Sequence, residues 1–530
     1  MPTPPQHPLD TAAQDAAQDP LDGPVPHVRV AVVGSGFSGL GAGARLLKYG
    51  IDDFVILERG KDVGGTWRDN TYPGACCDVP SNLYSFSFAP NPTWSRSFSP
   101  QPEIQEYLRT CARDFGLLPH LRFEHEVRMA RWNDAAAYWE VETSRGRLNA
   151  DVLLAGGGPL VDPAYPDIKG LTDTFEGELF HSARWNHDYD LRGKRVAVIG
   201  TGASAIQFVP QIQPDVAHLD LYQRSAPWIM PRTDRAFTGA ERALYRSLPA
   251  AQRAVRLGLF WGREGFWLWF NGKHPRLAKR AEGIARAHLK RAVRDPELRE
   301  KLTPDFTFGC KRVLLSNDYY PALAQPNVDV VTDGIAEVKA NSVVTKDGVE
   351  RPCDAIVLGT GFHATDIPMA HALVGRDGVL LADAWKDGMT AHQAAMTTGF
   401  PNLFFVIGPN SGLGHSSMTL VIEAQIKYAV DAIVSMERNG IAEIDVTREA
   451  QDAYNARLQA KMSETVWTTG GCSSWYLDPR TGTNTTLWPD YVWKFMWMNR
   501  RFSPAGHRAR TREQVRADAA AAPVATAPPL

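Results

Sequence analysis

The stretch HVRVAVVGSGFSG, residues 27–39, decides the fold that we predict for this chain. Its first seven residues are mostly apolar and β-branched, as in a buried strand, and Gly34, Gly36 and Gly39 follow with the spacing of a phosphate-binding turn. The first glycine permits the tight turn, the second lets a pyrophosphate approach the backbone, and the third lets strand and helix pack closely. An Ala- and Leu-rich helix is predicted from Phe37, and its free N–H groups would face the phosphates.

A second predicted strand, residues 54–57, ends at Glu58, which stands 19 residues after Gly39. A carboxylate at this place accepts hydrogen bonds from a ribose 2′-hydroxyl and repels a 2′-phosphate. The first site therefore favours FAD or NAD, and an ordinary glycine turn without a ligand is the alternative.

The same plan recurs at residues 194–225. A predicted strand, residues 194–199, leads into Gly200, Thr201, Gly202, Ala203, Ser204 and Ala205. A further strand, residues 218–222, leads to Arg224, which is 19 residues after Ala205, and to Ser225. A guanidinium group offers a planar fork of donors to a phosphate. The second site therefore favours NADPH over NADH, unless Arg224 is only a solvated surface residue.

Two more predicted strands, residues 151–155 and 354–358, end in glycine clusters where the chain crosses between domains. We therefore predict an α/β fold with two Rossmann-like dinucleotide-binding domains, one for FAD and one for NADPH, and a helical insert in the NADPH domain. The FAD-binding domain takes residues 27–165 and 359–508, the NADPH-binding domain residues 166–235 and 309–358, the insert residues 236–308, and disordered tails residues 1–26 and 509–530.

The composition is that of a soluble globular protein without a nucleic-acid signal. Apolar residues make up 44%, charged residues 22%, and the formal net charge is −2. Six cysteines without a C-x-x-C pattern predict no disulfide framework, no metal site and a reduced, cytoplasmic setting. The most membrane-like stretch, residues 257–270, is interrupted by Arg263 and Glu264 and is too short to span a bilayer. We expect no integral membrane association, and expect its aromatics to line a core or a substrate pocket; contact with a membrane surface is the alternative.

Four further motifs are spread over residues 28–502. GGTW at residues 64–67 is followed by YPG at 72–74 and by Asp78, residues 175–185 fit F-x-G-x-x-x-H-x-x-x-W, residues 200–207 read GTGASAIQ, and Lys311-Arg312 precedes DYY at 318–320. In these motifs the sequence resembles the flavin-dependent Baeyer–Villiger monooxygenases, whose nearest relatives are the flavin-containing monooxygenases that oxidise nitrogen or sulfur. Asn186 stands where the family usually has Pro or Asp, and residues 408–415 also differ from the best-known members.

The resemblance implies that NADPH reduces the flavin and that the reduced flavin traps O2 as a peroxide. A deprotonated peroxide would attack a ketone to give an ester or lactone, whereas a protonated one would oxidise sulfur or nitrogen. By the resemblance Arg312 lies beside the flavin and stabilises the anionic state, which is worth about 3–4 kcal/mol for one preorganised donor. Asp78 would pair with Arg312 and position it. The alternatives are an ion pair without a chemical role and a carboxylate that only anchors its loop.

The resemblance also implies the other cofactor contacts. On FAD these are Gly65, Thr66, Trp67, Tyr84, Met418 and, through its backbone, Val127; on NADPH they are Gln207, Trp475 beside the nicotinamide, and Lys311, which joins Arg224 on the 2′-phosphate. His181 would lie on a connection between the domains and couple their rotation to cofactor binding. A general base and a structural histidine are its alternatives.

Three other functions share this two-dinucleotide plan. A pyridine-nucleotide disulfide reductase needs a redox dithiol, which the sequence lacks. A non-catalytic flavoprotein that senses NADPH would be reduced without inserting oxygen, and an N- or S-oxygenating monooxygenase stays open. We predict an FAD- and NADPH-dependent monooxygenase that acts on a ketone and O2.

Overall fold

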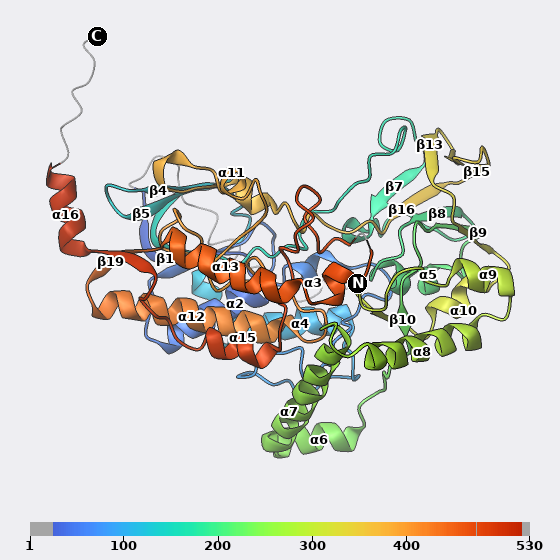
Figure 1. Cartoon of the computed structure of the whole chain (residues 1–530), viewed down its shortest axis with the longest axis horizontal. Helices are drawn as coiled ribbons and strands as arrows, with labels where there is room; N and C mark the ends of the chain where they lie inside the picture. Colours follow the sequence, from blue (N-terminus) through green and yellow to red (C-terminus); the bar gives the residue numbers. More distant parts are fainter. Residues whose placement is uncertain (1–24, 473, 522–530) are drawn as a thin grey trace, which may run out of the picture.

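Two largely parallel sheets, one toward each end of the long axis of the molecule, organise the fold (Figure 1). The computed structural model describes residues 25–472 and 474–521. The larger sheet has the strand order β17-β4-β5-β6-β1-β2-β3, and β18 also pairs with β6. Its strands are β1 (His27–Val33), β2 (Phe54–Leu57), β3 (Leu121–Arg122), β4 (Val127–Asn133), β5 (Tyr138–Thr143), β6 (Gly146–Ala155), β17 (Leu373–Val374) and β18 (Leu403–Phe405).

The smaller sheet is parallel throughout and has the strand order β12-β9-β8-β16-β7. Its strands are β7 (Glu178–His181), β8 (Arg195–Ile199), β9 (His218–Tyr222), β12 (Val328–Val331) and β16 (Ala355–Leu358). A small antiparallel sheet of β13 (Ile335–Lys339), β14 (Ser342–Thr345) and β15 (Glu350–Pro352) and the pair β10 (Ile229–Met230) and β11 (Leu314–Leu315) complete this end. The predicted α/β fold with two Rossmann-like sheets is confirmed.

Each sheet carries a glycine turn at the end of an inner strand. β1 leads through Gly34 into α2 (Phe37–Lys48). A Cβ atom on Gly39 would lie 1.8 Å from the carbonyl oxygen of Gly34, so only glycine lets α2 pack this close to the strand. β8 leads in the same way into Gly200, whose φ is +107°, and into α5 (Ala205–Ile212).

The core of the larger sheet lies between its strands and two helices. Val32 of β1, Leu40 of α2 and Val421 of α12 (Met418–Arg438) belong to one cluster of buried side chains. Burying a side chain of this size contributes about 1.5–3 kcal/mol. This packing fixes the place of the first glycine turn.

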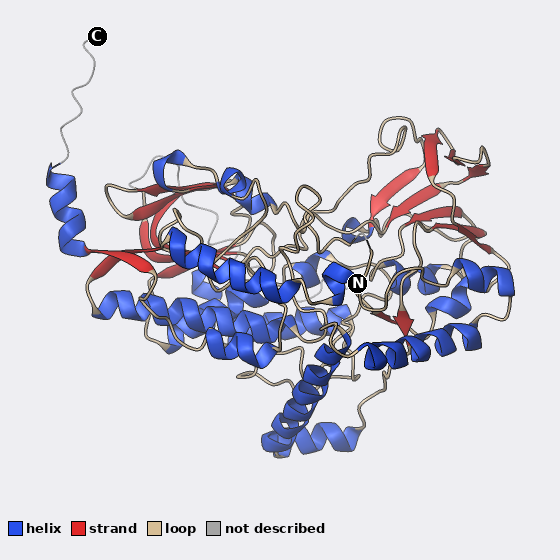
Figure 2. Cartoon of the chain, viewed as in Figure 1, coloured by secondary structure: helices blue, strands red, loops and turns tan. Residues whose placement is uncertain are grey.

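The predicted insert, which lies between β10 and β11, is helical, as expected (Figure 2). It consists of α6 (Gly239–Ser247), α7 (Pro249–Phe266), the 3-10 turn η3 (Trp267–Trp269), α8 (Pro275–Ala292) and α9 (Pro296–Lys301). Thr238 and Glu241 form a capping box that starts α6, and Pro249 and Pro275 start α7 and α8. Figure 1 shows α6 and α7 projecting from the body of the molecule.

The aromatic stretch of residues 257–270 divides at the end of α7. Trp267 and Phe270 are buried in the core, whereas Leu257 is 57% and Trp261 55% exposed. Among the described residues, no helix combines the length and the apolar character that crossing a bilayer requires.

The remaining helices connect and cover these parts. They are α3 (Thr66–Asp69), α4 (Gln101–Asp114), α10 (Tyr319–Leu323), α11 (Leu381–Ala384), α13 (Arg448–Met462), α14 (Val466–Thr469) and α15 (Val492–Met498), with the 3-10 turns η1 (Leu118–His120), η2 (Ser182–Arg184), η4 (Pro368–His371) and η5 (Arg376–Gly378).

The C-terminal tail that we predicted to be disordered from Ala509 is ordered as far as Ala521, so this prediction is wrong there. β20 (His507–Thr511) pairs antiparallel with β19 (Ile441–Val446), and α16 (Arg512–Ala521) follows. The other parts of the two predicted tails, residues 1–24 and 522–530, lie outside the described residues.

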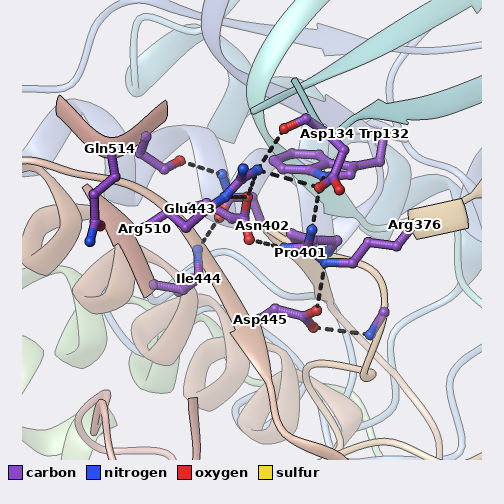
Figure 3. Close-up of polar contacts among 12 residues, drawn as sticks. Trp132, Asp134, Arg376, Pro401, Asn402, Glu443, Ile444, Asp445, Arg510 and Gln514 are labelled. Carbon is purple, nitrogen blue, oxygen red and sulfur yellow. Dashed lines mark hydrogen bonds and ion pairs between the residues drawn. The ribbon is translucent and has the colours of Figure 1, made fainter. Parts of the chain in front are cut away.

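An ionic cluster, here called the hairpin cluster, explains this order: it consists of Asp134, Arg376, Glu443, Asp445 and Arg510 (Figure 3). The carboxylate of Glu443 is buried and contacts the guanidinium groups of both Arg376 and Arg510. Arg510 also donates a hydrogen bond of 2.6 Å to the backbone carbonyl of Asp134. Composition alone could not predict this anchor, because its partners lie far away in the sequence.

Candidate active site

The first glycine turn is organised around the buried carboxylate of Glu58. It accepts hydrogen bonds from the backbone N–H of Ser35 (2.9 Å) and of Gly60 (2.7 Å), and Arg68 lies 2.6 Å away. Burial alone would raise the pKa of Glu58, but Arg68 and these hydrogen bonds outweigh it and lower the pKa. The carboxylate is therefore ionised and fixed before any ligand arrives.

Two glycine segments face each other beside this carboxylate. A Cβ atom on Gly65 would lie 3.4 Å from the Cα atom of Gly36, and one on Gly36 would lie 3.8 Å from Gly64. Side chains here would narrow the space in front of the turn. This cradle, with the ionised Glu58 behind it, fits a dinucleotide that has a free ribose 2′-hydroxyl, such as FAD.

Two aromatic residues predicted to touch FAD lie together next to the turn, and Phe37 at the start of α2 packs against one of them. The indole N–H of Trp67 donates to the hydroxyl of Tyr84 at 3.0 Å, and Phe37 meets Tyr84 edge-on with ring centroids 5.1 Å apart. Thr66 begins α3, Val127 begins β4 and Met418 begins α12, so each stands at the end of an element.

The second turn brings two cations together. The ammonium group of Lys311 donates to the hydroxyl of Ser225 at 2.7 Å, and burial followed by the nearby charge of Arg224 lowers the pKa of Lys311. Within the described part of the chain, neither cation forms an ion pair with a carboxylate. Thr201 donates to the backbone carbonyl of Ser225 at 3.4 Å. Two cations without a paired carboxylate, one of them bonded to a hydroxyl, fit a 2′-phosphate.

Gln207, which we predicted to contact NADPH, joins the two domains in this structure. Its side-chain oxygen accepts a hydrogen bond from the hydroxyl of Tyr72 (3.0 Å), and its amide donates to the backbone carbonyl of Cys76 (3.1 Å). A cavity of about 440 Å³ lies beside this contact and is lined in part by Tyr72, Cys76 and Arg232. The loop that carries Asp78 thus contacts the helix of the second turn.

Asp78 and Arg312, which are 234 residues apart, form the ion pair that we predicted. Arg312 donates through Nε at 3.0 Å and through Nη2 at 2.5 Å, both to Oδ2 of Asp78. The carboxylate of Asp78 raises the pKa of Arg312, and Arg312 in turn lowers the pKa of Asp78 against the opposing effect of burial. Each group therefore stabilises the charged form of the other.

Tyr476 is a site residue that we did not predict. Its buried hydroxyl lies next to Arg312, and burial raises the pKa of this hydroxyl to about 12. Trp475, its predicted neighbour in the sequence, is 48% exposed. The tyrosine could have been suspected only from its position beside the predicted tryptophan.

A disulfide between Cys310 and Cys472 was also not expected, because we predicted reduced cysteines. It joins the segment that carries Lys311 and Arg312 to the segment that precedes Trp475. Residues 162 positions apart give no sequence signal for such a pairing. The four other cysteines of the chain are free.

His181 lies where the two connections between the domains meet. It is fully buried at the end of β7, with Tyr165 of one connection and Phe362 of the other at ring distances of 5.9 and 5.8 Å. The connections also bond to each other, through the N–H of Ala164 and the carbonyl of Gly361 at 2.9 Å. Burial lowers the pKa of His181 to about 4, so its ring is neutral near pH 7 and weakly basic. This position favours a coupling role over a general base.

Comparisons with known proteins agree with this geometry. The sequence model of the flavin-binding monooxygenase-like family matches residues 27–240. The chain is 55% identical over 483 residues to a Baeyer-Villiger monooxygenase of Streptomyces coelicolor, covering 91% of this chain and 92% of that protein. A closed crystal structure of cyclohexanone monooxygenase superposes with a TM-score of 0.80 and 28% identity, covering 92% of this chain and all of that chain. OTEMO, solved in complex with FAD and NADP, superposes with a TM-score of 0.80 and 26% identity, and the coverage of both chains is the same.

Proposed function

Because the chain belongs to the Baeyer–Villiger monooxygenase family, we propose that the Asp78–Arg312 pair is the centre at which it oxygenates a ketone to an ester or lactone. The enzyme uses FAD and NADPH. The observation that carries the proposal is the state of the Arg312 guanidinium. Nε and Nη2 are held by Asp78, whereas no carboxylate in the described part of the chain pairs with Nη1. A fixed, charged donor with an N–H edge that no carboxylate occupies is what a developing negative charge needs.

The two glycine turns would hold the two cofactors. Glu58, with the Gly36–Gly65 cradle, would hold the ribose and pyrophosphate of FAD, and Arg224 with Lys311 would hold the 2′-phosphate of NADPH. Bound FAD, once reduced by NADPH, supplies activated oxygen to the ketone. The task of the chain is to hold these groups in register and to stabilise the charge that the reaction creates.

Arg312 would stabilise the negative charge that develops on the ketone oxygen when the carbonyl carbon is attacked. The pair with Asp78 keeps the guanidinium protonated and fixes its plane, so little reorganisation is needed during the reaction. One such donor contributes about 3–4 kcal/mol to the lowering of the barrier. Asp78 would not exchange protons in this scheme, because its pKa is lowered.

The departure from the family motif at Asn186 does not favour oxidation of nitrogen or sulfur. Its amide donates to Glu178 at 2.7 Å, and its side-chain oxygen accepts from the N–H of Asp188 at 3.0 Å. Asn186 thus closes a turn next to β7. These contacts account for the residue without any role in selecting the substrate.

The experiment is to supply the purified holoenzyme with NADPH, O2 and either ketones, sulfides or amines, and to identify the products by mass spectrometry. We expect NADPH oxidation to be stimulated by ketones and esters to appear in proportion. Release of hydrogen peroxide alone with every ketone tested would contradict the proposal.

A further inference from the structure

The polar face of α7 forms hydrogen bonds with the loop that carries Asp78. Gln252 donates to the backbone carbonyl of Asn91 at 2.7 Å, and Arg256 donates to the carbonyls of Asn82 and Leu83, both at 3.0 Å. Residues 252, 256 and 263 are spaced so that they share one face of a helix. This face therefore supplies partners to carbonyl groups of loop 78–91.

Arg263, the last of these residues, reaches Asp78 itself. Its Nη2 donates to the backbone carbonyl of Asp78 at 3.3 Å, and its charge lies close enough to lower the pKa of the Asp78 carboxyl. Asp78 thus stands between two guanidinium groups: Arg312 holds its carboxylate and Arg263 holds its backbone. The two arginines come from different parts of the fold, because Arg263 belongs to the helical insert.

The neighbouring residue locks this end of α7 in place. Glu264 is buried and accepts hydrogen bonds from the N–H groups of Val492 (3.2 Å) and Trp493 (3.4 Å), which begin α15. A carboxylate at a helix N-terminus is stabilised by the free N–H groups there. The two charged residues that interrupt the aromatic stretch in the sequence therefore both dock the insert on the FAD-binding domain.

We propose that Arg263 is a positioning residue for oxygen insertion: it fixes the backbone of Asp78, and through Asp78 it fixes the direction of the Arg312 guanidinium. This inference rests on the function proposed above. Arg263 makes no contact with Arg312 within hydrogen-bonding distance in the described residues, so its effect is transmitted by Asp78.

The test compares Arg263→Ala and Arg263→Lys with Arg253→Ala, an exposed arginine of the same helix. Two quantities are measured on each holoenzyme: hydrogen–deuterium exchange of peptides covering residues 78–91, and kcat, KM and ester formed per NADPH with a ketone. For Arg263→Ala we expect exchange to become roughly tenfold faster and kcat to fall roughly tenfold with KM nearly unchanged, the size expected for loss of one charged hydrogen bond. Arg263→Lys, which still donates to the carbonyl, should restore most of the slow exchange and most of the kcat. Arg253→Ala should change neither the exchange rate nor kcat.

Faster exchange with unchanged kcat and unchanged ester yield would overturn the inference, because Arg263 would then stabilise the loop without serving the reaction. Unchanged exchange would overturn it as well. If Arg263→Ala does not retain FAD, Arg263→Gln, which keeps an amide donor without the charge, is judged by the same criteria. Failure of the wild-type enzyme to form any ester would instead refute the proposed function, while the exchange measurement would still decide whether Arg263 holds the loop.

Discussion

The hairpin cluster and the Asp78–Arg312 pair use the same two chemical groups in opposite ways. In the hairpin cluster, Arg376 contacts three carboxylates, those of Asp134, Glu443 and Asp445, and Glu443 is shared with Arg510 (Figure 3). The side chain of Glu443 is only 2% exposed. Arg312, by contrast, has a single carboxylate partner in the described part of the chain, and its side chain remains 33% exposed.

This difference indicates what each group of charges is for. A network in which buried charges are mutually satisfied holds distant segments together, and removing one member leaves uncompensated buried charge. A guanidinium that is fixed by one partner and keeps a free edge can receive a ligand or a developing charge. We therefore expect changes in the hairpin cluster to affect stability and changes at Asp78–Arg312 to affect chemistry.

The largest effect is expected for Glu443→Ala. It leaves Arg376 and Arg510 without the buried carboxylate that they share, and breaking a buried pair in this way costs about 3–5 kcal/mol of the free energy of unfolding. Denaturant unfolding followed by fluorescence measures this loss. Ester formation per folded, FAD-loaded molecule should stay the same. Unchanged stability of Glu443→Ala, or a loss of ester formation in the folded variant, would contradict this expectation.

Arg312→Ala should have the converse result. Loss of one preorganised donor lowers the rate of ester formation at least about a hundredfold, corresponding to about 3–4 kcal/mol. FAD content and the thermal midpoint should stay close to those of the wild type, because Arg263 still lies near Asp78. Arg508→Ala, which removes an exposed arginine of β20, serves as the control. Normal ester output from Arg312→Ala would refute the role of the guanidinium.

Arg224→Ala extends the comparison to a guanidinium that has no carboxylate partner among the described residues. Losing a charged hydrogen bond to the 2′-phosphate should raise the KM for NADPH about tenfold to a hundredfold. The KM for NADH, which lacks this phosphate, should change little. Steady-state kinetics with both cofactors measures the ratio, and equal effects on both would exclude phosphate recognition.

The pH dependence of stability should differ in sign between the two sites. Burial raises the pKa of Asp445 above its ordinary value of 3.8, so its contribution to stability decreases as the pH rises through the interval above 3.8. The pKa of Asp78 is lowered, so its contribution is complete above 3.8 and is lost only as the pH falls below that value.

Thermal midpoints measured between pH 4 and 7 test this smallest effect. Relative to the wild type, Asp445→Asn should become progressively more stable as the pH rises, because it removes a charge that burial disfavours. Asp78→Asn should differ from the wild type by a constant amount over the same range. The same slope for both variants would contradict the assigned pKa directions.

The parts of the fold that depend on local backbone requirements could be predicted from the sequence. Gly34 and Gly200 have positive φ, and Gly39 packs against the carbonyl oxygen of Gly34, so these requirements are local, and the spacing of the glycines located both sheets. The pairing of Asp78 with Arg312 could be predicted only through family resemblance, because the residues are 234 positions apart.

What could not be predicted shares one physical cause, which is contact between distant segments. Arg263 appeared only as an interruption of an aromatic stretch, yet it contacts a residue 185 positions away. The ordered C-terminal hairpin depends on the pairing of Arg510 with Glu443, 67 positions away. Single-sequence patterns report periodicity and turns, and they do not report which charges meet in the folded chain.

The most direct test of the central claim is the ester formed per NADPH consumed, measured for Asp78→Asn and Asp445→Asn side by side. Each change replaces a carboxylate that contacts an arginine by an amide of the same shape. We predict that Asp78→Asn diverts NADPH to hydrogen peroxide and lowers this ratio, whereas Asp445→Asn leaves the ratio at the wild-type value. An unchanged ratio in Asp78→Asn, or an equal fall in both variants, would contradict it.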